Sequence, residues 1–262
     1  MTSLSINQKK LIRSLARKKN RQETGLFLVE GDKMVREVLS GAASGGSAFE
    51  VAMLVATDDW LDEFGGISDG GTDTVCVKAD ELRQVSILQQ PNRAMALVKQ
   101  MHHNLDLSLL QNSLCIALEN VQDPGNLGSI VRTGDWFGIR DIICSEDCVE
   151  LYNPKVIQST MGSFLRVRVH YVDLVGLIGE VRSADYQIFG TSGQGENLYE
   201  TSLPSLGMVV LGNESRGLSE GVLRQTDRVL NIPHHDPDMH SESLNVATAA
   251  AVICAEFRRQ GS

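Results

Sequence analysis

Polar residues that could bind or act on a ligand follow short apolar runs at three places in the chain. The first is the segment 119–133, in which an Asp-Pro-Gly turn precedes Asn126 and Arg132. We expect Asn126 to cap a helix, and Arg132 then lies within two turns of its start. A plain strand-to-helix turn with a solvent-facing arginine is the alternative, because turn chemistry alone explains an Asp-Pro-Gly sequence.

The second and third places lie further along the chain. In residues 210–218 a glycine ends an apolar run, where a ligand can approach the backbone closely, and Glu214 and Arg216 bracket the start of a helix. In the third, Ser243 and Asn245 precede a helix rich in alanine. An ordinary loop with a surface ion pair would explain the second segment, and a capped, buried helix the third. Polar clusters at several strand ends on one sheet edge nevertheless favour a binding site.

The elements that carry these segments form a predicted parallel sheet covered by helices on both faces. Short apolar runs separated by helical patterns are typical of such an α/β fold. Ligands of these sheets bind beyond the carboxyl ends of the strands, where the polar segments begin. The expected strands are residues 114–118, 142–144, 167–169, 188–189, 208–211 and 229–232.

A smaller α/β unit precedes this sheet. We expect it over residues 1–98, followed by a linker over 99–112 and a second domain over 113–262. It opens with a helix capped by Ser5, on which Leu11, Ile12, Leu15 and Ala16 form an apolar stripe and basic residues lie mostly on the other face.

Charge is distributed unevenly along the chain. The 262 residues carry a net charge of −9, which taken alone argues against a nucleic-acid partner. Residues 1–21, however, hold seven basic side chains and no acidic one. A polyanion responds to such a local cluster rather than to the net charge, although a basic run is also compatible with a merely solvated helix face.

Composition indicates a globular protein with buried thiols. Charged residues make up 22% and apolar residues 42% of the chain. No apolar run approaches the ~18 residues of a membrane span, and the first residues are too polar for a secretory signal, so we expect a cytoplasmic protein without a membrane partner. The five cysteines are scattered without a C-x-x-C spacing, which argues against disulfides and a zinc ribbon.

Together, the three polar segments resemble the three sequence motifs of the SpoU/TrmH family of RNA ribose 2′-O-methyltransferases, within the SPOUT superfamily. The resemblance extends from Leu114 to Arg259 and includes residues 153–163, which resemble the helix between the first two motifs. The first unit, with its basic residues and the run 27–31, is similar to the substrate-binding domain often fused ahead of this catalytic domain.

The resemblance implies a fold, a cofactor and a partner. The fold is a mainly parallel α/β domain with a deep trefoil knot over residues 212–245, an exception to the rule that chains do not thread their own loops. The cofactor is S-adenosylmethionine, bound in the knot, and the knotted domain forms a homodimer. Donor-binding positions of the family, mostly backbone groups, map onto Thr191, Gly212, Ile232, Leu244 and Asn245.

The resemblance also assigns catalytic roles to Arg132, Asn126, Glu214, Ser243 and Asn245. Asn126 and Glu214 would orient Arg132 and the ribose, whereas Ser243 and Asn245 would hold the knot and the methionine end of the donor. Some accounts of the family make the arginine a general base. Because arginine stays protonated in proteins, a cation that orients a phosphate and stabilises a developing alkoxide is physically easier.

The expected substrate is structured RNA, either ribosomal or transfer RNA. In the first unit Arg17, Lys18, Lys19 and Arg21 are the candidate RNA-binding residues. The alternative function is a catalytically silent RNA-binding relative, which would be expected to lose Arg132 or Asn126. Both residues are present.

Two further segments suggest other chemistry and are not favoured. The loop 234–242 contains three histidines and two aspartates, but methyl transfer needs no metal and Pro237 breaks any i, i+4 ligand pair, so we predict no metal site. Residues 190–195 are glycine-rich but lack the G-x-G-x-x-G order of a dinucleotide fingerprint, which argues against a nucleotide-dependent oxidoreductase.

Overall fold

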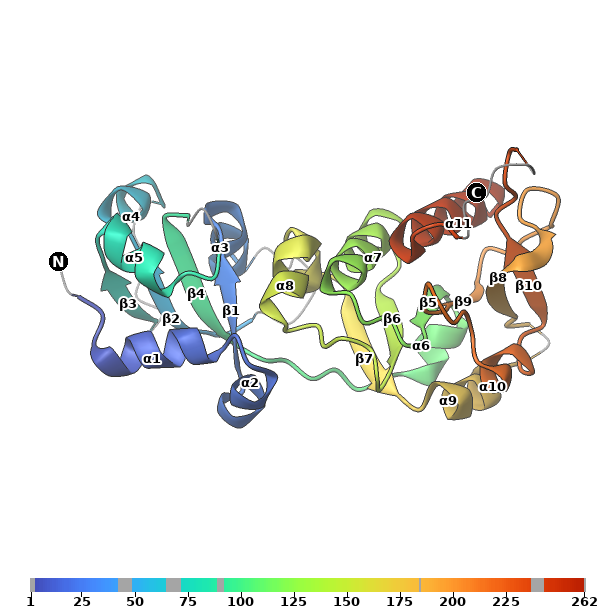
Figure 1. The fold of residues 1–262 in the computed structure, drawn as a ribbon, viewed down its shortest axis with the longest axis horizontal. Coiled ribbons are helices and arrows are strands. Elements are labelled where there is room, and N and C mark those ends of the chain that lie inside the picture. The colour runs from blue at the N-terminus through green and yellow to red at the C-terminus, as the bar shows by residue number, and fades with distance from the viewer. Residues whose placement is uncertain are drawn as a thin grey trace. The chain divides into compact units, whose positions relative to one another are not determined.

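The chain divides into two compact units. The computed structural model describes residues 3–41, 49–64, 72–88, 92–183, 185–236 and 243–261. Contacts between residues group Met1–His102 with Glu150–Leu165 in the first unit, and His103–Val149 with Arg166–Ser262 in the second. Figure 1 shows the elements of both units along the chain. The contacts therefore assign the segment Glu150–Leu165, which we expected in the second domain, to the first unit.

The first unit contains a mixed four-stranded sheet of order β1-β4-β2-β3. Strand β4 is antiparallel to β1 and β2, and β2 is parallel to β3. The strands are β1 (Leu26–Glu30), β2 (Val51–Ala56), β3 (Asp73–Cys76) and β4 (Ala94–Lys99). The helices are α1 (Ile6–Ser14), α2 (Lys18–Thr24), α3 (Asp32–Leu39), α4 (Asp58–Phe64), α5 (Ala79–Val85), α8 (Pro154–Thr160) and the 3₁₀ turn η1 (Ser163–Leu165).

The predicted first helix is two helices. Its cap is confirmed, because Ser5 Oγ accepts from the backbone N–H of Gln8 at 3.2 Å and the Gln8 side chain accepts from Ser5 N at 2.8 Å. Helix α1 ends at Ser14, where Asn20 Nδ2 donates to the Ser14 carbonyl at 2.9 Å and Arg21 donates to the Leu15 carbonyl at 2.6 Å. These side chains satisfy carbonyls that a helix end leaves unpaired, which stabilises the break.

The segment Glu150–Leu165 joins the first unit through aromatic packing. The ring of Phe27 on β1 lies 4.5 Å from that of Tyr152 and 5.8 Å from that of Phe164, measured between centroids. The Tyr152 hydroxyl donates to the Met101 carbonyl at 2.6 Å. Such aromatic pairs form between residues far apart in the sequence, so no local pattern could have revealed them.

The second unit is built on a six-stranded sheet of order β10-β8-β9-β5-β6-β7, in which every paired strand is parallel. All six predicted strands are present, which confirms the parallel α/β fold. They are β5 (Leu114–Leu118), β6 (Asp141–Ser145), β7 (Arg168–Val172), β8 (Ile188–Asn197), β9 (Gly207–Leu211) and β10 (Arg228–Asn231).

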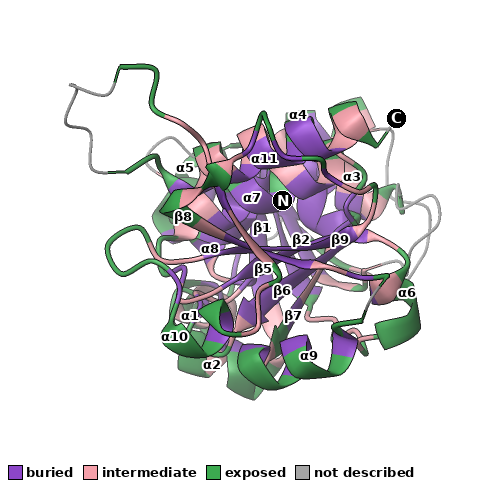
Figure 2. Cartoon of the chain, turned by 90° about the vertical axis from the view of Figure 1, so that its right-hand side faces the viewer, coloured by how far each residue is buried: buried purple, intermediate pink, exposed green. Residues whose placement is uncertain are grey.

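Helices cover both faces of this sheet. Helices α7 (Pro124–Trp136) and α11 (Val246–Gln260) pack together on one face, and α9 (Leu174–Val181) and α10 (Glu220–Leu223) lie on the other (Figures 1 and 2). Helix α6 (Leu107–Gln111) contacts α9 and β5. The central strands β5, β6 and β9 are almost wholly buried between these layers (Figure 2).

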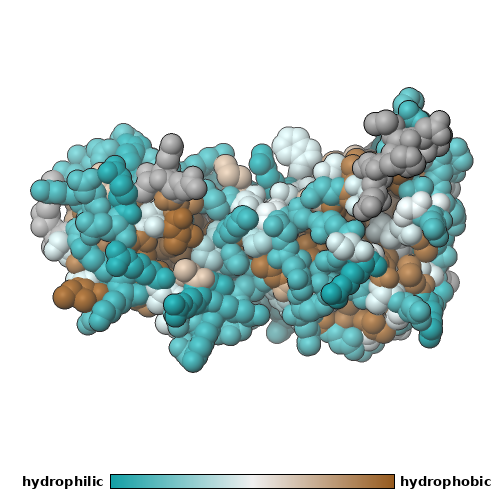
Figure 3. Space-filling view, in the orientation of Figure 1, coloured by the Kyte–Doolittle hydropathy of each residue, from teal (hydrophilic) through white to brown (hydrophobic). Residues whose placement is uncertain are grey.

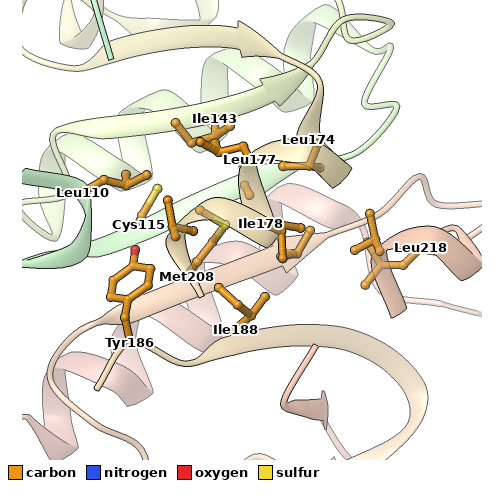
Figure 4. Close-up of a cluster of buried hydrophobic side chains, with 14 residues drawn as sticks. Leu110, Cys115, Ile143, Leu174, Leu177, Ile178, Tyr186, Ile188, Met208 and Leu218 are labelled. Atoms are coloured by element: carbon orange, nitrogen blue, oxygen red, sulfur yellow. The ribbon is translucent and has the colours of Figure 1, made fainter. Parts of the chain in front are cut away.

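The core between the sheet and α9 is apolar. Figure 4 shows Leu177 and Ile178 of α9 against Cys115 and Met208 of the central strands, with Tyr186 beside them. All five cysteines are unpaired, and Cys115, Cys144, Cys148 and Cys254 are buried, as expected, whereas Cys76 is half-buried. None of the described helices is both long and apolar enough to cross a membrane.

Asp141 is a buried carboxylate at the start of β6. Its two oxygens accept from Arg168 at 2.8 and 2.6 Å, and Oδ1 lies 2.9 Å from Nε2 of His170. Burial raises the pKa of Asp141, but the hydrogen bonds from His170 and Arg168 outweigh it and lower the pKa to about 2. The folded state therefore holds Asp141 ionised at pH values at which the unfolded chain is protonated.

Replacing Asp141→Asn should lower the free energy of unfolding by about 2 to 3 kcal/mol at neutral pH. Because the folded-state pKa lies below the unfolded value of about 3.9, this contribution is present above about pH 4 and is lost as the pH falls towards 2. Urea unfolding of both proteins from pH 7 to pH 2.5 measures it. A difference between the two that stayed constant with pH would contradict the assignment.

Candidate active site

Three side chains from the three polar segments form one chain of hydrogen bonds. The Asn126 side-chain amide donates to the Glu214 carboxylate, and Nδ2 of Asn245 donates to Oδ1 of Asn126 at 2.9 Å. The donor and the acceptor of the Asn126 amide are therefore both engaged. Asn126 joins segments that are separated by about a hundred residues of sequence, and it marks the candidate site at one edge of the sheet.

The start of α7 sets the position of Asn126. Asp123, rather than the predicted Asn126, caps this helix, because its side chain accepts from the backbone N–H of Asn126 at 3.0 Å. Pro124 occupies the first helical position, where its missing N–H costs nothing. With Asp123 as the cap, the Asn126 side chain is free to reach Glu214.

Glu214 lies in a tight loop after β9. The Gly217 N–H donates to the Asn213 carbonyl at 2.8 Å, and Gly217 has a φ of +68°. Oδ1 of Asn213 accepts from the backbone N–H groups of Ser215 at 2.9 Å and Arg216 at 3.3 Å. A Cβ atom on Gly212 would lie 2.4 Å from backbone atoms of Gly217, so the loop closes only with glycine there.

Residues at the end of β5 anchor this loop. Nδ2 of Asn213 donates to the Asn120 carbonyl at 3.0 Å, and the Glu119 carboxylate accepts from the Ser219 N–H at 2.7 Å. Asn120 has a φ of 56° and donates its own N–H to Ser145 Oγ at 2.9 Å. Sequence reasoning missed Glu119, Asn120 and Asn213. Their signal was the same as that of the residues it found, namely polar side chains directly after apolar strands.

Asn245 has two functions. It caps α11, since its Oδ1 accepts from the N–H groups of Ala247 at 3.0 Å and Thr248 at 3.3 Å, while its Nδ2 contacts Asn126. Ser243 is exposed and is not part of the contact chain. Of the five predicted catalytic residues, the structure thus brings Asn126, Glu214 and Asn245 into contact.

Arg132 lies apart from these three residues. It is exposed on α7 and lines an open hollow of about 390 Å³ together with Ser129, Thr133, Trp136, Phe137 and Ala251. Six residues along an α-helix correspond to about one and two-thirds turns, so Arg132 points away from the side of α7 that carries Asn126. The guanidinium is therefore available to a bound ligand.

Three of the candidate donor-binding positions lie in or directly after three adjacent strands. Gly212 follows β9, Ile232 follows β10, and Thr191 lies in β8 between them, directly after Gly190, which pairs with both neighbours. Thr191 Oγ1 donates to the Val210 carbonyl at 3.0 Å. The fourth position, Leu244, is 48% exposed just before α11. These side chains are uncharged, so any recognition here depends on backbone groups and apolar contact.

The glycine-rich segment 190–195 belongs to β8 itself. A Cβ atom on Gly195 would lie 2.5 Å from the Val229 carbonyl of β10, so the glycine permits close packing of two strands. A dinucleotide fingerprint would instead form a turn that opens a helix. The segment therefore gives no support to an oxidoreductase.

Comparison with known proteins identifies the family. Residues 113–255 match the SpoU rRNA Methylase family, and residues 7–96 match the MRM3-like substrate binding domain. The chain belongs to the SpoU rRNA methylase family. The three segments joined by Asn126 all lie within the match to the SpoU family, and the resemblance inferred from the sequence is confirmed.

Individual SpoU relatives cover nearly the whole chain. The chain is 29% identical over 94% of its length to the 23S rRNA (guanosine(2553)-2′-O)-methyltransferase RlmP of Bacillus subtilis, of which it covers 94%. An uncharacterized tRNA/rRNA methyltransferase of Synechocystis is 30% identical over 96% of the chain and 90% of its own length.

Two solved structures are similar over both units. A structure assigned to the TrmH family of RNA methyltransferases, from Porphyromonas gingivalis, has a TM-score of 0.87 and 32% identity and covers 99% of this chain and 100% of its own. An AdoMet-bound rRNA methyltransferase from Sinorhizobium meliloti has a TM-score of 0.84 and 25% identity, with 99% and 97% covered.

The basic residues of this SpoU-family chain differ in exposure. Arg17, Lys18 and Lys19 are exposed where α2 begins, and the visible surface over α2 is hydrophilic in Figure 3. Arg21, also predicted to bind RNA, is only 1% exposed and pairs with Glu150 at 2.6 Å. Its assignment as an RNA-binding residue is wrong, because its guanidinium is used inside the first unit.

The histidine-rich loop is described only in part. His234, His235 and Asp236 are among the described residues, whereas residues 237–242, which include His240, lie outside them. Within the part of the chain that the structure describes, no three His, Cys, Asp or Glu side chains are grouped to hold a metal ion. The absence of a metal site in this loop stays a prediction.

Proposed function

We propose that this chain transfers a methyl group from S-adenosylmethionine to a ribose 2′-hydroxyl of structured RNA, in the ribosome or in transfer RNA. The observation that carries the proposal is the contact chain Glu214–Asn126–Asn245, which joins all three SpoU motifs at one sheet edge. The Bacillus relative, named for 2′-O-methylation of ribosomal RNA, supports the same reaction. A catalytically silent relative is not favoured, because Arg132 and Asn126 are both present.

The uncharged positions along β8 and just after β9 and β10 fit the donor. Thr191, Gly212, Ile232 and Leu244 carry no charge, which suits backbone recognition of a neutral adenine, and Asn245 lies next to Leu244. When bound, S-adenosylmethionine supplies an electrophilic methyl group. In keeping with the family, we propose that residues 212–245 form the knot that holds it.

Methyl transfer requires the ribose oxygen to lie in line with the methyl group at about 3 Å, with its developing negative charge stabilised. Arg132 is suited to this task because a guanidinium stays protonated and can contact both an RNA phosphate and an alkoxide. The hydrogen bonds among Asn126, Glu214 and Asn245 fix the start of α7 relative to the loop after β9 and the start of α11. Ser243, at the entrance to α11, is proposed to hold the methionine end of the donor.

Arg132→Ala should reduce methyl transfer about a hundredfold or more, because it removes charge stabilisation in the transition state. The dissociation constant of S-adenosylmethionine, measured by calorimetry, should stay within about twofold, because backbone groups bind the donor. Arg140→Ala, an exposed arginine beyond α7, serves as the control. Turnover of Arg132→Ala at the wild-type rate would remove this residue from the mechanism.

We further propose that the active form is a homodimer that uses the outer face of α7 and α11. Trp136 is 84% exposed on this face and lines the hollow with Phe137 and Ala251. A large exposed aromatic ring beside an open hollow is typical of a protein–protein interface. Forming a complex removes the large apolar surface of the ring from water, which stabilises the complex. The family resemblance implies that the C-terminal helix, here α11, lies in the dimer interface.

Trp136→Glu should convert the dimer to a monomer, because a carboxylate buried in an apolar contact loses its hydration. Light scattering on the eluted protein measures the mass against the 28.6 kDa of one chain. Tyr199→Glu, at an aromatic residue 53% exposed elsewhere in the second unit, should leave the mass unchanged. A monomeric wild-type protein would rule out the dimer.

The exposed cluster Arg17, Lys18 and Lys19 is proposed to contact the RNA backbone. The match of residues 7–96 to a substrate binding domain supports this role. Lys19 has only a loose pair, 3.7 Å from Glu23, so its charge is available to a polyanion.

Replacing Arg17, Lys18 and Lys19 together by Gln should weaken RNA affinity and flatten its salt dependence. For every phosphate that is no longer neutralised, the slope of log affinity against log salt should become shallower by about 0.7 to 0.9. Fluorescence titration from low to moderate salt measures both quantities, and Lys78→Gln with Arg83→Gln is the control pair. If the triple variant keeps the wild-type slope, this surface does not bind RNA.

A further inference from the structure

The second unit is strongly acidic for a domain that acts on RNA. Its residues, 103–149 and 166–262, include nineteen acidic side chains, ten arginines and no lysine. An excess of negative charge repels a polyanion unless local positive charge lies where the RNA must bind. Binding of RNA to this unit therefore depends on which of the ten arginines have no other partner.

Most of these arginines are already engaged. Seven pair with carboxylates or donate to a carbonyl, and among the described residues the other three, Arg132, Arg140 and Arg216, have no side-chain partner. The engaged arginines are Arg166, Arg168, Arg182, Arg224, Arg228, Arg258 and Arg259.

Two of the three available arginines belong to the sequence segments that form the active site. Arg132 follows Asn126 by six residues on α7, and Arg216 follows Glu214 by two residues in the loop after β9. The Glu214 carboxylate accepts from Asn126, and among the described residues no ion pair joins it to Arg216. Of the three, Arg216 is thus the available arginine in the loop that carries Glu214, whereas Arg132 lines the hollow on α7.

The loop holds Arg216 in place before any ligand binds. Its backbone N–H donates to Asn213 Oδ1, and the next residue, Gly217, closes the turn onto the Asn213 carbonyl. Asn213 is itself tied to Asn120, and Glu119 accepts from Ser219 on the far side. The side chain of Arg216 is exposed. Because these hydrogen bonds already fix the backbone, binding through Arg216 would order only its side chain.

We propose that Arg216 binds a phosphate of the RNA backbone next to the ribose that is methylated. This inference rests on the proposed function, and it assigns the second guanidinium of the site to substrate binding rather than to the methyl-transfer step. A guanidinium matches two phosphate oxygens with parallel hydrogen bonds, which gives both affinity and orientation. It also offsets the repulsion between the phosphate and the nearby Glu214.

The methionine carboxylate of the donor is the other anion that such a site could meet. A contact with the donor would change the donor affinity, whereas a contact with RNA would not. Separate measurements of the two affinities therefore distinguish the two anions.

The test uses full-length wild-type protein and Arg216→Gln, Arg216→Lys and Arg224→Gln. Arg224 is the matched control because it is an exposed arginine of the same unit, paired with Glu220 on α10. The substrate is ribosomal RNA purified from cells that lack this gene, and labelled S-adenosylmethionine reports methyl transfer. Fluorescence titration measures RNA affinity without turnover, and calorimetry measures donor affinity.

For Arg216→Gln we expect KM and Kd for RNA to rise about tenfold, kcat to stay within about twofold, and donor affinity to stay unchanged. The slope of log Kd against log salt should fall by about 0.7 to 0.9, the change expected when one phosphate is no longer neutralised. Arg216→Lys should recover part of the affinity and most of the slope. Arg224→Gln should match the wild type in all four measurements.

An unchanged Kd and salt slope in Arg216→Gln would overturn the proposal, as would a loss confined to kcat. A weaker donor affinity would assign Arg216 to the donor carboxylate instead. If the wild-type protein transferred no methyl group, the proposed function would fail. Lower RNA affinity with a flatter slope in Arg216→Gln would still support the phosphate contact, so the two failures are distinguishable.

Discussion

The site depends on the two-sided hydrogen bonding of the Asn126 amide. Its nitrogen donates to Glu214 and its oxygen accepts from Asn245, so one side chain connects the loops that follow β5 and β9 with the start of α11. Only a carboxamide offers both a donor and an acceptor in this geometry. An aspartate would place two anions in contact with each other, and an alanine would leave both partners without this bond.

The parallel sheet makes that connection possible. Strands β5 and β9 are neighbours, so their carboxyl ends bring Glu119 and Asn120 next to Asn213. The same edge continues through β8 and β10 to Ile232, next to the histidine-rich loop. Because the ends of neighbouring strands are already close together, short polar side chains there can contact each other. The backbone turns at Asn120, Gly212 and Gly217 set their directions instead, which explains why small and amide residues recur there.

Local patterns predicted the strands well, because buried parallel strands are short apolar runs with polar ends. They also located Asn126, Glu214 and Asn245, although not the hydrogen bonds between them. Local patterns gave the wrong role to residues whose contacts are with side chains far away in the sequence. Arg21 looked like its exposed basic neighbours, yet Glu150 draws it into the interior. The cap of α7 was assigned one turn too late, because Asp123 and Asn126 are both good caps and only the Glu214 contact separates their roles.

The distribution of charge explains how an acidic protein can remain selective for RNA. Ion pairs remove most arginines of the second unit from contact with a polyanion, so non-specific attraction to RNA is weak there. In the proposed function, the guanidinium groups of Arg132 and Arg216 are the ones that stay available for the RNA substrate. Since Glu214 and Glu119 repel phosphate at other positions around the same loop, an RNA strand is accepted in few orientations. Under the proposed function, the negative charge of this domain would therefore favour the RNA orientation in which the ribose can react.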